Sequence, residues 1–299
     1  MSAESAGSRP VWMGRPKPAT SAVKGVVVVV ILALIAVPFW LVLATSVSSD
    51  AKVNANGGWS LWPDELDFSA YTSVFKGGTI GHALWVSVLV TGLGTALSLA
   101  STTFLAYALS RPNVLAGKPI LLAVLFTFLF PAGMIPSFLV VTDLKLFDHL
   151  AALFVPAMIN VFNLVVMRGF FQGIPEELYE AARLDGAGDV RTLFRIVLPL
   201  SKAIIAVVGL YYAVGYWNDY FRAMLYTNGG DLNPLSTVLR GFVVAGNNPN
   251  QEVGLNITGM APMKAISALV VIAIVPIAAA FPFLQRYFTK GVMTGAVKS

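Results

Sequence analysis

Long apolar runs alternate with short polar segments along most of the chain. Six of these runs are long enough to cross a bilayer, because a spanning helix needs about 20 predominantly apolar residues. We place the six runs at about 25–49, 82–109, 119–141, 150–171, 203–226 and 265–284. The pattern therefore predicts an all-α integral membrane protein with six transmembrane helices.

The first run could instead be a secretory signal, because Ala44-Thr45-Ser46 loosely resembles a cleavage site. The apolar core of a signal peptide is only about 7 to 15 residues long. The uncharged run from Gly25 to about Ser49 is longer, so we interpret it as an uncleaved first span. Residues 1–24, which are polar and basic, are expected to form a disordered tail.

Two further spans carry unusual residues at bilayer depth. In the second, Gly92, Ala96 and Ala100 recur at four-residue spacing and predict a face of small side chains against which another helix packs. In the third, two prolines and a glycine lie within Pro131–Pro136 and predict a kink or a break in the helix. That break either lines a pathway or is an ordinary packed proline kink, since freed backbone groups need protein or water.

The two longest polar segments between spans are expected to be external loops. Residues 50–81 contain Trp59 and Trp62, which suit a membrane interface. Residues 227–262 are rich in glycine, proline and asparagine. Both segments are therefore predicted to lie outside the bilayer.

Composition supports membrane residence. The chain is 57% hydrophobic and 12% charged, whereas roughly a quarter of the residues in a soluble domain are charged. It has no cysteine, which excludes disulfides and thiolate chemistry. Its net charge of +5 is scattered over short loops and does not form the basic stripe of a nucleic-acid-binding protein. No Gly-x-x-x-x-Gly-Lys-Ser/Thr is present, so this chain is not expected to hydrolyse ATP itself, and no cofactor site is expected.

The distribution of positive charge predicts the orientation. If the N-terminus is inside, the inner segments contain 14 of the 20 Lys and Arg residues. The positive-inside rule therefore favours a multi-pass protein of the plasma or inner membrane with both termini in the cytoplasm. These 14 residues are Arg9, Arg15, Lys17, Lys24, Arg111, Lys118, Arg168, Arg183, Arg191, Arg195, Lys202, Arg286, Lys290 and Lys298.

Polar and aromatic residues gather in the outer half of the fifth span. An interfacial aromatic belt explains several of them, but ionisable groups in a span tend to face each other or a wet cavity. Asp219 and Arg222, three residues apart, are predicted to pair on one helix face. We predict a substrate-facing cluster that also includes two asparagines of the fourth span. Its members are Asn160, Asn163, Tyr212, Tyr216, Asn218 and Asp219.

The most polar stretch between spans runs from Gly173 to Ser201. Pro175 suits the first helical position of a short helix, and Glu176 and Glu177 follow where the helix dipole favours anions. Glycines at 186 and 188 bracket a turn in which positive φ costs little. Asp189 is expected to cap a second short helix that Pro199 ends. From physics alone, this could be an amphipathic hairpin resting on a membrane surface.

The order of residues in this stretch resembles the EAA loop of ABC importer permeases. The resemblance implies coupling helices that dock into a cleft on a cytoplasmic ATPase subunit. The matching positions, which we take as ATPase-coupling residues, are Glu180, Ala181, Ala182, Arg183, Asp185, Gly186, Ala187, Ile196, Leu198 and Pro199.

Nearly the whole chain after residue 25 is similar to the permease subunits of maltose-type carbohydrate importers, especially the LplC-like branch. Further resemblance lies in Gly133–Pro136, Tyr212–Asn218 and Gln285–Lys298. It implies a MetI-like fold over 25–299, a homologous second permease, two cytoplasmic ATP-binding subunits and an extracellular substrate-binding protein. It also implies a C-terminal tail that reaches toward the ATPases, and ATP-driven import of a sugar or oligosaccharide through the 173–201 loop.

The two alternative functional classes are an ion-coupled secondary transporter and an intramembrane hydrolase. An ion-coupled secondary transporter often carries charges near the midplane, whereas the ionisable cluster here lies toward one end of a span. An intramembrane hydrolase needs a base beside its nucleophile. The chain has only two histidines, His82 and His149, near loop ends, and Ser98 at depth has no obvious base.

Overall fold

The computed structural model describes residues 18–76, 78–112, 114–245 and 260–295, and every regular element within these ranges is helical. Three helices are long and apolar enough to span a membrane, and three bent pairs of helices raise the number to six if each pair is one span. The six predicted apolar segments are thus all found. Much of the predicted basic tail and residues 246–259 lie outside the described ranges.

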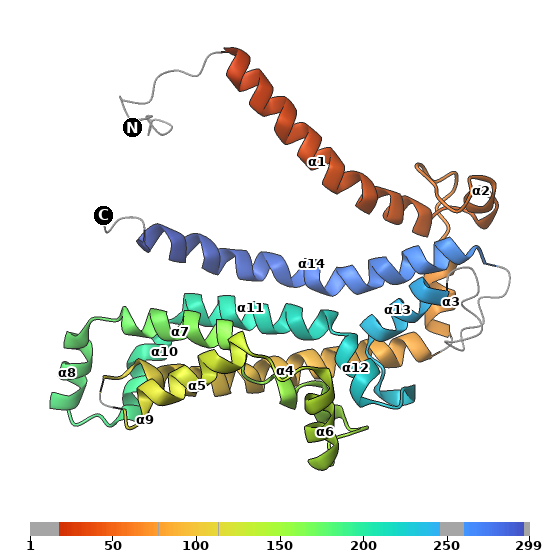
Figure 1. The fold of residues 1–299 in the computed structure, drawn as a ribbon. Helices are drawn as coiled ribbons and strands as arrows, with labels where there is room; N and C mark the ends of the chain where they lie inside the picture. Colours follow the sequence, from red (N-terminus) through yellow and green to blue (C-terminus); the bar gives the residue numbers. More distant parts are fainter. Residues whose placement is uncertain (1–17, 77, 113, 246–259, 296–299) are drawn as a thin grey trace.

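The first span is α1, which runs from Pro18 to Ser46. It begins seven residues before the predicted start, so residues 18–24 belong to the helix and not to the tail. Only its last residues, 44–46, are buried. Figure 1 shows α1 standing apart from the other helices except near its C-terminal end. Most of its apolar surface therefore has no partner within the described chain.

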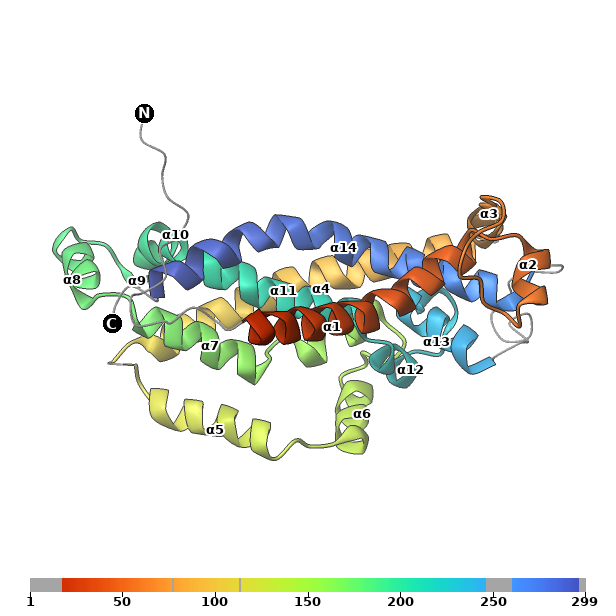
Figure 2. The ribbon, with the colours of Figure 1, turned by 90° about the horizontal axis from the view of Figure 1, so that it is seen from above.

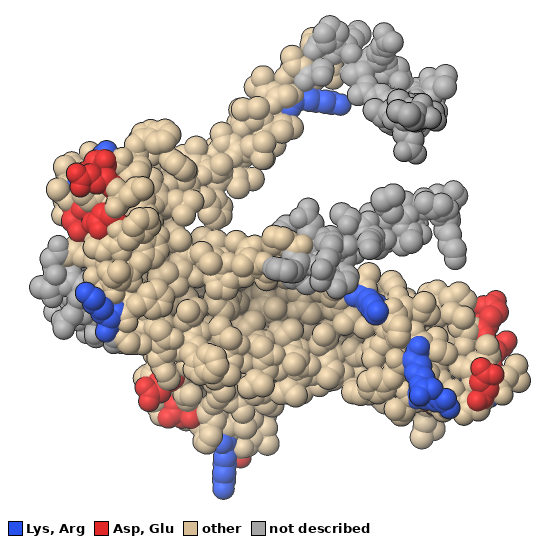
Figure 3. All heavy atoms as spheres, turned by 180° about the vertical axis from the view of Figure 1, so that it is seen from behind, with Lys and Arg blue, Asp and Glu red and all other residues tan. Residues whose placement is uncertain are grey.

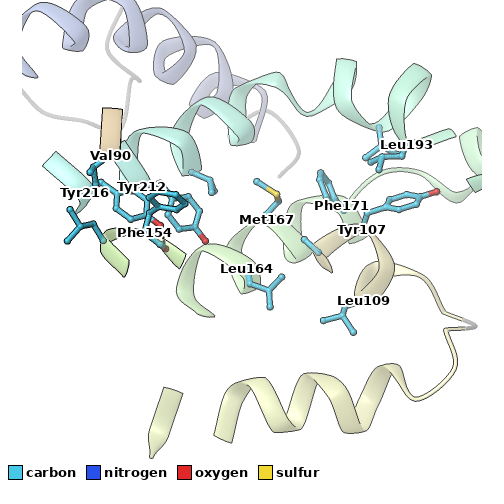
Figure 4. Packing of buried hydrophobic residues seen from close by; sticks show 14 of the residues in the cluster. Val90, Tyr107, Leu109, Phe154, Leu164, Met167, Phe171, Leu193, Tyr212 and Tyr216 are labelled. Atoms are coloured by element: carbon cyan, nitrogen blue, oxygen red, sulfur yellow. Dashed lines mark hydrogen bonds between the residues drawn. The ribbon is translucent and has the colours of Figure 1, made fainter. Parts of the chain in front are cut away.

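The centre of the molecule is a bundle of four helices. Helix α4 (Thr79–Ser110) packs against α7 (Val161–Gln172) and α11 (Lys202–Asn218), and α14 (Pro262–Gly295) packs on α11. A cluster of buried side chains runs lengthwise between α4, α7 and α11, from Val90 and Tyr216 at one end to Tyr107 and Leu193 at the other (Figure 4). Helices in a bilayer are held together by close packing and polar contacts, because lipid is as apolar as the side chains.

Small residues of α4 are packed on a different face from the predicted one. Gly92, Ala96 and Ala100 are all exposed, so within the described residues no helix covers that face. The buried positions are Gly94 and Ser98, which face α11. Helix periodicity alone could not distinguish two faces that both carry small side chains.

The predicted break in the third span is confirmed and is sharper than a kink. Helix α5 (Gly117–Leu129) and helix α6 (Met134–Asp143) meet at 120°. Gly133 between them has φ +83°, a conformation that favours glycine. Helix α5 buries no residue, and Figure 2 shows α5 and α6 standing to one side of the bundle.

The fourth and fifth spans are not the continuous helices that were predicted. Residues 150–157 form two 3₁₀ turns, η1 (Leu150–Leu153) and η2 (Val155–Ala157), and α7 follows at an angle of 51°. In the fifth span, α11 ends at Asn218, and the short α12 (Phe221–Tyr226) follows it. Hydropathy identified the apolar segments but not the points where their backbones leave helical geometry.

The two segments predicted as long loops are partly helical. Residues 50–81 contain α2 (Asp50–Ala55) and α3 (Ser69–Lys76), and residues 227–262 contain η4 (Gly230–Leu232) and α13 (Leu235–Ala245). At this end, the fully buried Lys264 ammonium of α14 pairs with Asp50 at 3.3 Å and with Asp67 at 2.5 Å. Lys264 also donates to Ser69 Oγ at 3.1 Å. This ion network fastens the α2–α3 segment to the beginning of α14.

Candidate functional site

The 173–201 segment forms a helical hairpin at the end of the molecule opposite to α2 and α13 (Figure 1). Helix α8 runs from Glu176 to Leu184, with both acidic residues in its first turn as predicted, but Pro175 is its N-cap and not its first helical residue. The second arm consists of α9 (Asp189–Thr192), a π-helical turn η3 (Leu193–Val197) and α10 (Leu198–Leu200). The prediction of two short helices joined by a glycine bend is confirmed.

The bend itself depends on one glycine. Gly186 has φ +70°, its N–H donates to the Arg183 carbonyl at 3.0 Å, and the Ala187 N–H donates to the Ala182 carbonyl at 2.8 Å. This pair of hydrogen bonds is a Schellman motif, which needs a left-handed residue at the position of Gly186. Gly188 has φ −72°, so the prediction that it also needs glycine freedom was wrong.

Two details of the second arm differ from expectation. Asp189 does not cap the helix through its side chain, because Gly188 occupies the N-cap and Asp189 is the first helical residue. Pro199 lies inside the last turn, and the arm ends at Leu200, one residue later. The chain then bends by 85° into α11, so the hairpin leads directly into the bundle.

The inner face of α8 is held against the end of α4. Tyr179 and Ala182 are buried, and the Arg111 guanidinium lies 3.7 Å from the centroid of the Tyr179 ring. Arg111 Nη2 also pairs with Glu176 Oε1 at 3.4 Å. Burial raises the pKa of the Tyr179 phenol above its ordinary value. Arg111 therefore fixes the hairpin to the bundle by a cation–π contact and an ion pair.

The outer face of α8 is open. Glu180, Ala181, Arg183 and Asp185 are exposed, whereas Ala182 is turned inward. In the second arm, Val197 is fully buried, Ile196 and Leu198 are half-buried, and Pro199 is exposed. The predicted coupling residues thus divide between an anchoring side and a free side.

Apolar residues that sequence reasoning did not single out lie beside the free side. Leu184 is 90% exposed and Val190 is 69% exposed. These two side chains add exposed apolar surface to the charged free side. The sequence could not identify Leu184 as exposed, because a leucine in an amphipathic helix is expected to face the core.

The second predicted group does not form an open site. Tyr212 and Tyr216 are only 5% and 4% exposed. The Tyr212 hydroxyl pairs with Thr102 Oγ1 at 2.6 Å and accepts the Asn160 N–H at 2.9 Å. The Tyr216 hydroxyl pairs with Ser98 Oγ at 2.7 Å and donates to the Phe154 carbonyl at 3.2 Å. Both tyrosines pack inside the bundle and line no open surface in this structure, so their predicted substrate-facing role stays a prediction.

The three asparagines of that group have local structural contacts. Asn163 is buried, whereas Asn160 caps α7 by accepting the Asn163 N–H at 3.1 Å. Asn218 is exposed and donates to the carbonyl of Val214 at 2.9 Å.

The predicted Asp219–Arg222 ion pair is present at 2.9 Å. Asp219 lies at the break between α11 and α12, however, and not on one helix face with Arg222. Its carboxylate also accepts the backbone N–H of Arg222 at 3.1 Å. Asp219 therefore binds the first turn of α12 from the residue before its N-cap, Tyr220.

The geometry gives no support to a hydrolase. The partner of Ser98 Oγ is a tyrosine hydroxyl, which is not a base at neutral pH. His82 Nε2 lies 2.7 Å from the Asp231 carbonyl, and His149 Nδ1 lies 2.9 Å from that of Phe147. Neither histidine is paired with Ser98 among the described residues.

Comparison with known proteins agrees with this architecture. The chain is 39% identical over 263 residues to the polygalacturonan/rhamnogalacturonan transport system permease protein YtcP of Bacillus subtilis, covering 87% of this chain and 92% of that protein. It is likewise 39% identical over 267 residues to protein LplC of the same organism, covering 89% and 90%. The melibiose/raffinose/stachyose import permease protein MelC, also from Bacillus subtilis, is 28% identical over 267 residues, covering 88% and 91%.

A solved structure shows the same fold. The crystal structure of a bacterial ABC transporter involved in the import of the acidic polysaccharide alginate matches with a TM-score of 0.82 and 30% identity, covering 92% of this chain and 100% of that one. Residues 84–294 match the family described as binding-protein-dependent transport system inner membrane component. With its bent apolar spans and the helical hairpin between the fourth and fifth of them, the chain belongs to this family of membrane permeases.

Proposed function

We propose that the chain is the permease subunit of an ATP-driven carbohydrate importer, and that the α8–α10 hairpin couples it to a separate ATPase subunit. The observation that carries this proposal is the division of α8 into two faces. Arg111 and Tyr179 hold one face on the bundle, while Glu180, Ala181 and the almost fully exposed Leu184 are left for a partner. A small alanine between longer side chains allows close approach of a second protein.

The hairpin is built to transmit movement rather than to absorb it. It is continuous with α7 before it and with α11 after it, and Arg111 ties it to the end of α4. These three helices are in turn joined by the Tyr212 and Tyr216 hydroxyls. A force on α8 would therefore displace α4, α7 and α11 together, which is the rocking of a bundle that alternating access requires.

We also propose that the hairpin end faces the cytoplasm, with both termini on that side. Helix α1 begins and α14 ends toward the side that carries α8 (Figures 1 and 2). Charged side chains gather toward the ends of the face in Figure 3 and leave its middle largely uncharged. The excess of Lys and Arg in the segments on the α8 side supports the orientation.

The carbohydrate class rests on the relatives, of which YtcP and MelC carry the names of saccharide transport systems. A second, homologous permease and an extracellular binding protein complete the proposed assembly. The exposed apolar surfaces of α1 and α5 leave room for a second permease to pack beside the bundle.

Labelling of single cysteines tests the orientation, since the native chain has no cysteine. Glu180→Cys on the hairpin and Glu65→Cys at the opposite end replace exposed glutamates in both cases. A membrane-impermeant maleimide should label Glu180→Cys only in inside-out vesicles and Glu65→Cys only in right-side-out ones. The reverse result would overturn the proposal.

Coupling is tested with the same variant. A bifunctional crosslinker on Glu180→Cys should capture an ATP-hydrolysing subunit in membranes of the native host. Crosslinking that yields no such subunit, together with uptake by the purified chain alone in an ion gradient, would favour a secondary transporter instead.

A further inference from the structure

A cavity of about 490 Å³ lies at the hairpin end of the bundle but outside the hairpin itself. The ends of α4 and α7 and the beginning of α5 form its walls. Leu109, labelled in Figure 4, lies on the side of α4 that faces α5. Arg111 of its lining takes part in the proposed coupling, whereas the other lining residues have no role in it.

Three cations line the cavity, namely Arg111, Lys118 and Arg168. Only Arg111 has a carboxylate partner among the described residues, and that partner is Glu176 of α8. Arg168 donates from Nε to the Leu109 carbonyl at 2.8 Å and from Nη1 to Gln172 Oε1 at 3.1 Å. Both of those acceptors are neutral, so the charge of Arg168 is fixed in place but not compensated.

Lys118 adds a second uncompensated charge at the rim. It is exposed, and the described residues offer it no ion pair or side-chain hydrogen bond. It is the second residue of α5, whose positive dipole end therefore lies at the same rim. The fixed cation Arg168, the nearby cation Lys118 and the N-terminus of α5 together make the cavity selective for an anion.

The remaining lining of the cavity is apolar. Leu109, Val114, Pro119 and Leu121 line it together with the cations, and α5 has no buried residue. A soluble anion would gain nothing from these side chains, whereas the glycerol and first methylenes of a lipid would. Basic pockets between spans at the cytoplasmic boundary are suited to anionic headgroups.

We propose that this cavity binds the headgroup phosphate of an anionic phospholipid, with Arg168 and Lys118 as the two phosphate-binding residues. The assignment to the inner leaflet rests on the proposed orientation. The binding itself does not, because it follows from the charges and walls of the cavity. The occupied site would also fill the space beside α5, which has no buried residue of its own.

Native mass spectrometry of the purified full-length chain in detergent tests the site. Phosphatidylglycerol, phosphatidylcholine and inorganic phosphate are titrated separately into the wild type, Lys118→Gln and Lys24→Gln. The control Lys24 is also an exposed lysine near the same end of a span, but it does not line the cavity. We expect one phosphatidylglycerol to bind more tightly than phosphatidylcholine, and Lys118→Gln to weaken it roughly fivefold. Lys24→Gln should leave its affinity unchanged.

Arg168 provides an independent variant. Arg168→Lys keeps the charge and should retain most of the binding, whereas Arg168→Gln should lose it to the same extent as Lys118→Gln or further. Equal affinities for the two lipids in the wild type, or inorganic phosphate bound as tightly as phosphatidylglycerol, would overturn the proposal. Because no ATPase is present, failure here is distinct from failure of the coupling proposal.

Discussion

The hydroxyl of Tyr212 on α11 accepts the backbone N–H of Asn160 at 2.9 Å, at the point where the fourth span changes from 3₁₀ turns to α7. One turn further along α11, Tyr216 donates to the carbonyl of Phe154 at 3.2 Å. A backbone that leaves helical geometry within a membrane must have its polar groups satisfied by the protein. In this structure the two tyrosine hydroxyls therefore satisfy the backbone of the broken span.

Removing the first of these hydroxyls should destabilise the bundle. Tyr212→Phe leaves the Asn160 N–H and the Thr102 hydroxyl without their partner, at a cost of about 1–3 kcal/mol. Thermal unfolding of the full chain in detergent measures the loss. Tyr211→Phe is the matched control, since Tyr211 is exposed, and it should leave the unfolding temperature unchanged. Equal unfolding temperatures for both variants would contradict the role given to Tyr212.

Adding one carbon to Gly94 should separate α4 from α11. A Cβ there would lie 2.9 Å from Cε2 of the Tyr216 ring, whereas a Cβ on Gly92 meets nothing within 4 Å. Gly94→Ala should lower the free energy of unfolding by about 1–3 kcal/mol through overpacking, and Gly92→Ala should not. The comparison is made by thermal unfolding of the isolated chain, and a larger effect of Gly92→Ala would show that the packed face has been misassigned.

The bend of the hairpin should tolerate a side chain at only one of its two glycines. Gly186→Ala forces a left-handed conformation on alanine, at a cost of about 1–2 kcal/mol, although the added carbon has free space. Gly188→Ala meets neither strain nor contact. Limited proteolysis of the 173–201 segment should therefore be faster only in Gly186→Ala. Gly186→Pro should open the bend and abolish transport, because proline cannot adopt positive φ.

Substitutions at two neighbouring alanines should distinguish an effect on ATPase docking from an effect on folding. Ala181 is exposed and Ala182 is buried. Ala181→Leu should leave the unfolding temperature unchanged but abolish co-purification of the ATPase, because the added bulk lies on the free face. Ala182→Leu should instead destabilise the chain by about 1–3 kcal/mol through overpacking. Normal ATPase binding by the folded Ala181→Leu protein would refute a docking role for that face.

Acid should release the α2–α3 segment from α14. Hydrogen bonds from Lys264 and Ser69 lower the pKa of Asp67 from 3.8 to about 2. A carboxyl whose pKa is lowered on folding stabilises the protein above its unfolded pKa, and that contribution is lost as the pH falls through the folded value. Stability should therefore fall between about pH 4 and pH 2.

A matched pair of variants shows which carboxylate causes the loss of stability in acid. Asp67→Asn should lower stability at neutral pH and make the acid-dependent fall smaller. Asp64 also has a pKa of about 2, owing chiefly to the hydroxyl of Ser49, so Asp64→Asn should remove a separate part of the fall and leave the Lys264 contacts intact. Protease accessibility of residues 50–81 as a function of pH measures both. An unchanged pH profile in Asp67→Asn would exclude the Lys264–Asp67 pair as its cause.

The amino-acid sequence by itself determined the features that depend on neighbouring residues. Six apolar segments, the interruption at Pro131–Pro136 and the start of α8 after Pro175 all follow from hydropathy, proline and helix-end chemistry. These signals are local, because a proline lacks its N–H and an apolar run prefers lipid whatever the rest of the chain does.

Only the tertiary structure decided which faces of the helices are used. Ser98 and Tyr216 are 118 residues apart, and Arg111 and Glu176 are 65 apart, so no spacing within a span could reveal either pair. Tyr212 and Tyr216 predict a ligand cluster from the sequence, whereas in the tertiary structure their hydroxyls bind the backbone of Asn160 and Phe154 at the break before α7. The physical reason is that a tyrosine in a membrane binds whichever backbone group lies within reach, and only the packing of distant helices determines which group that is.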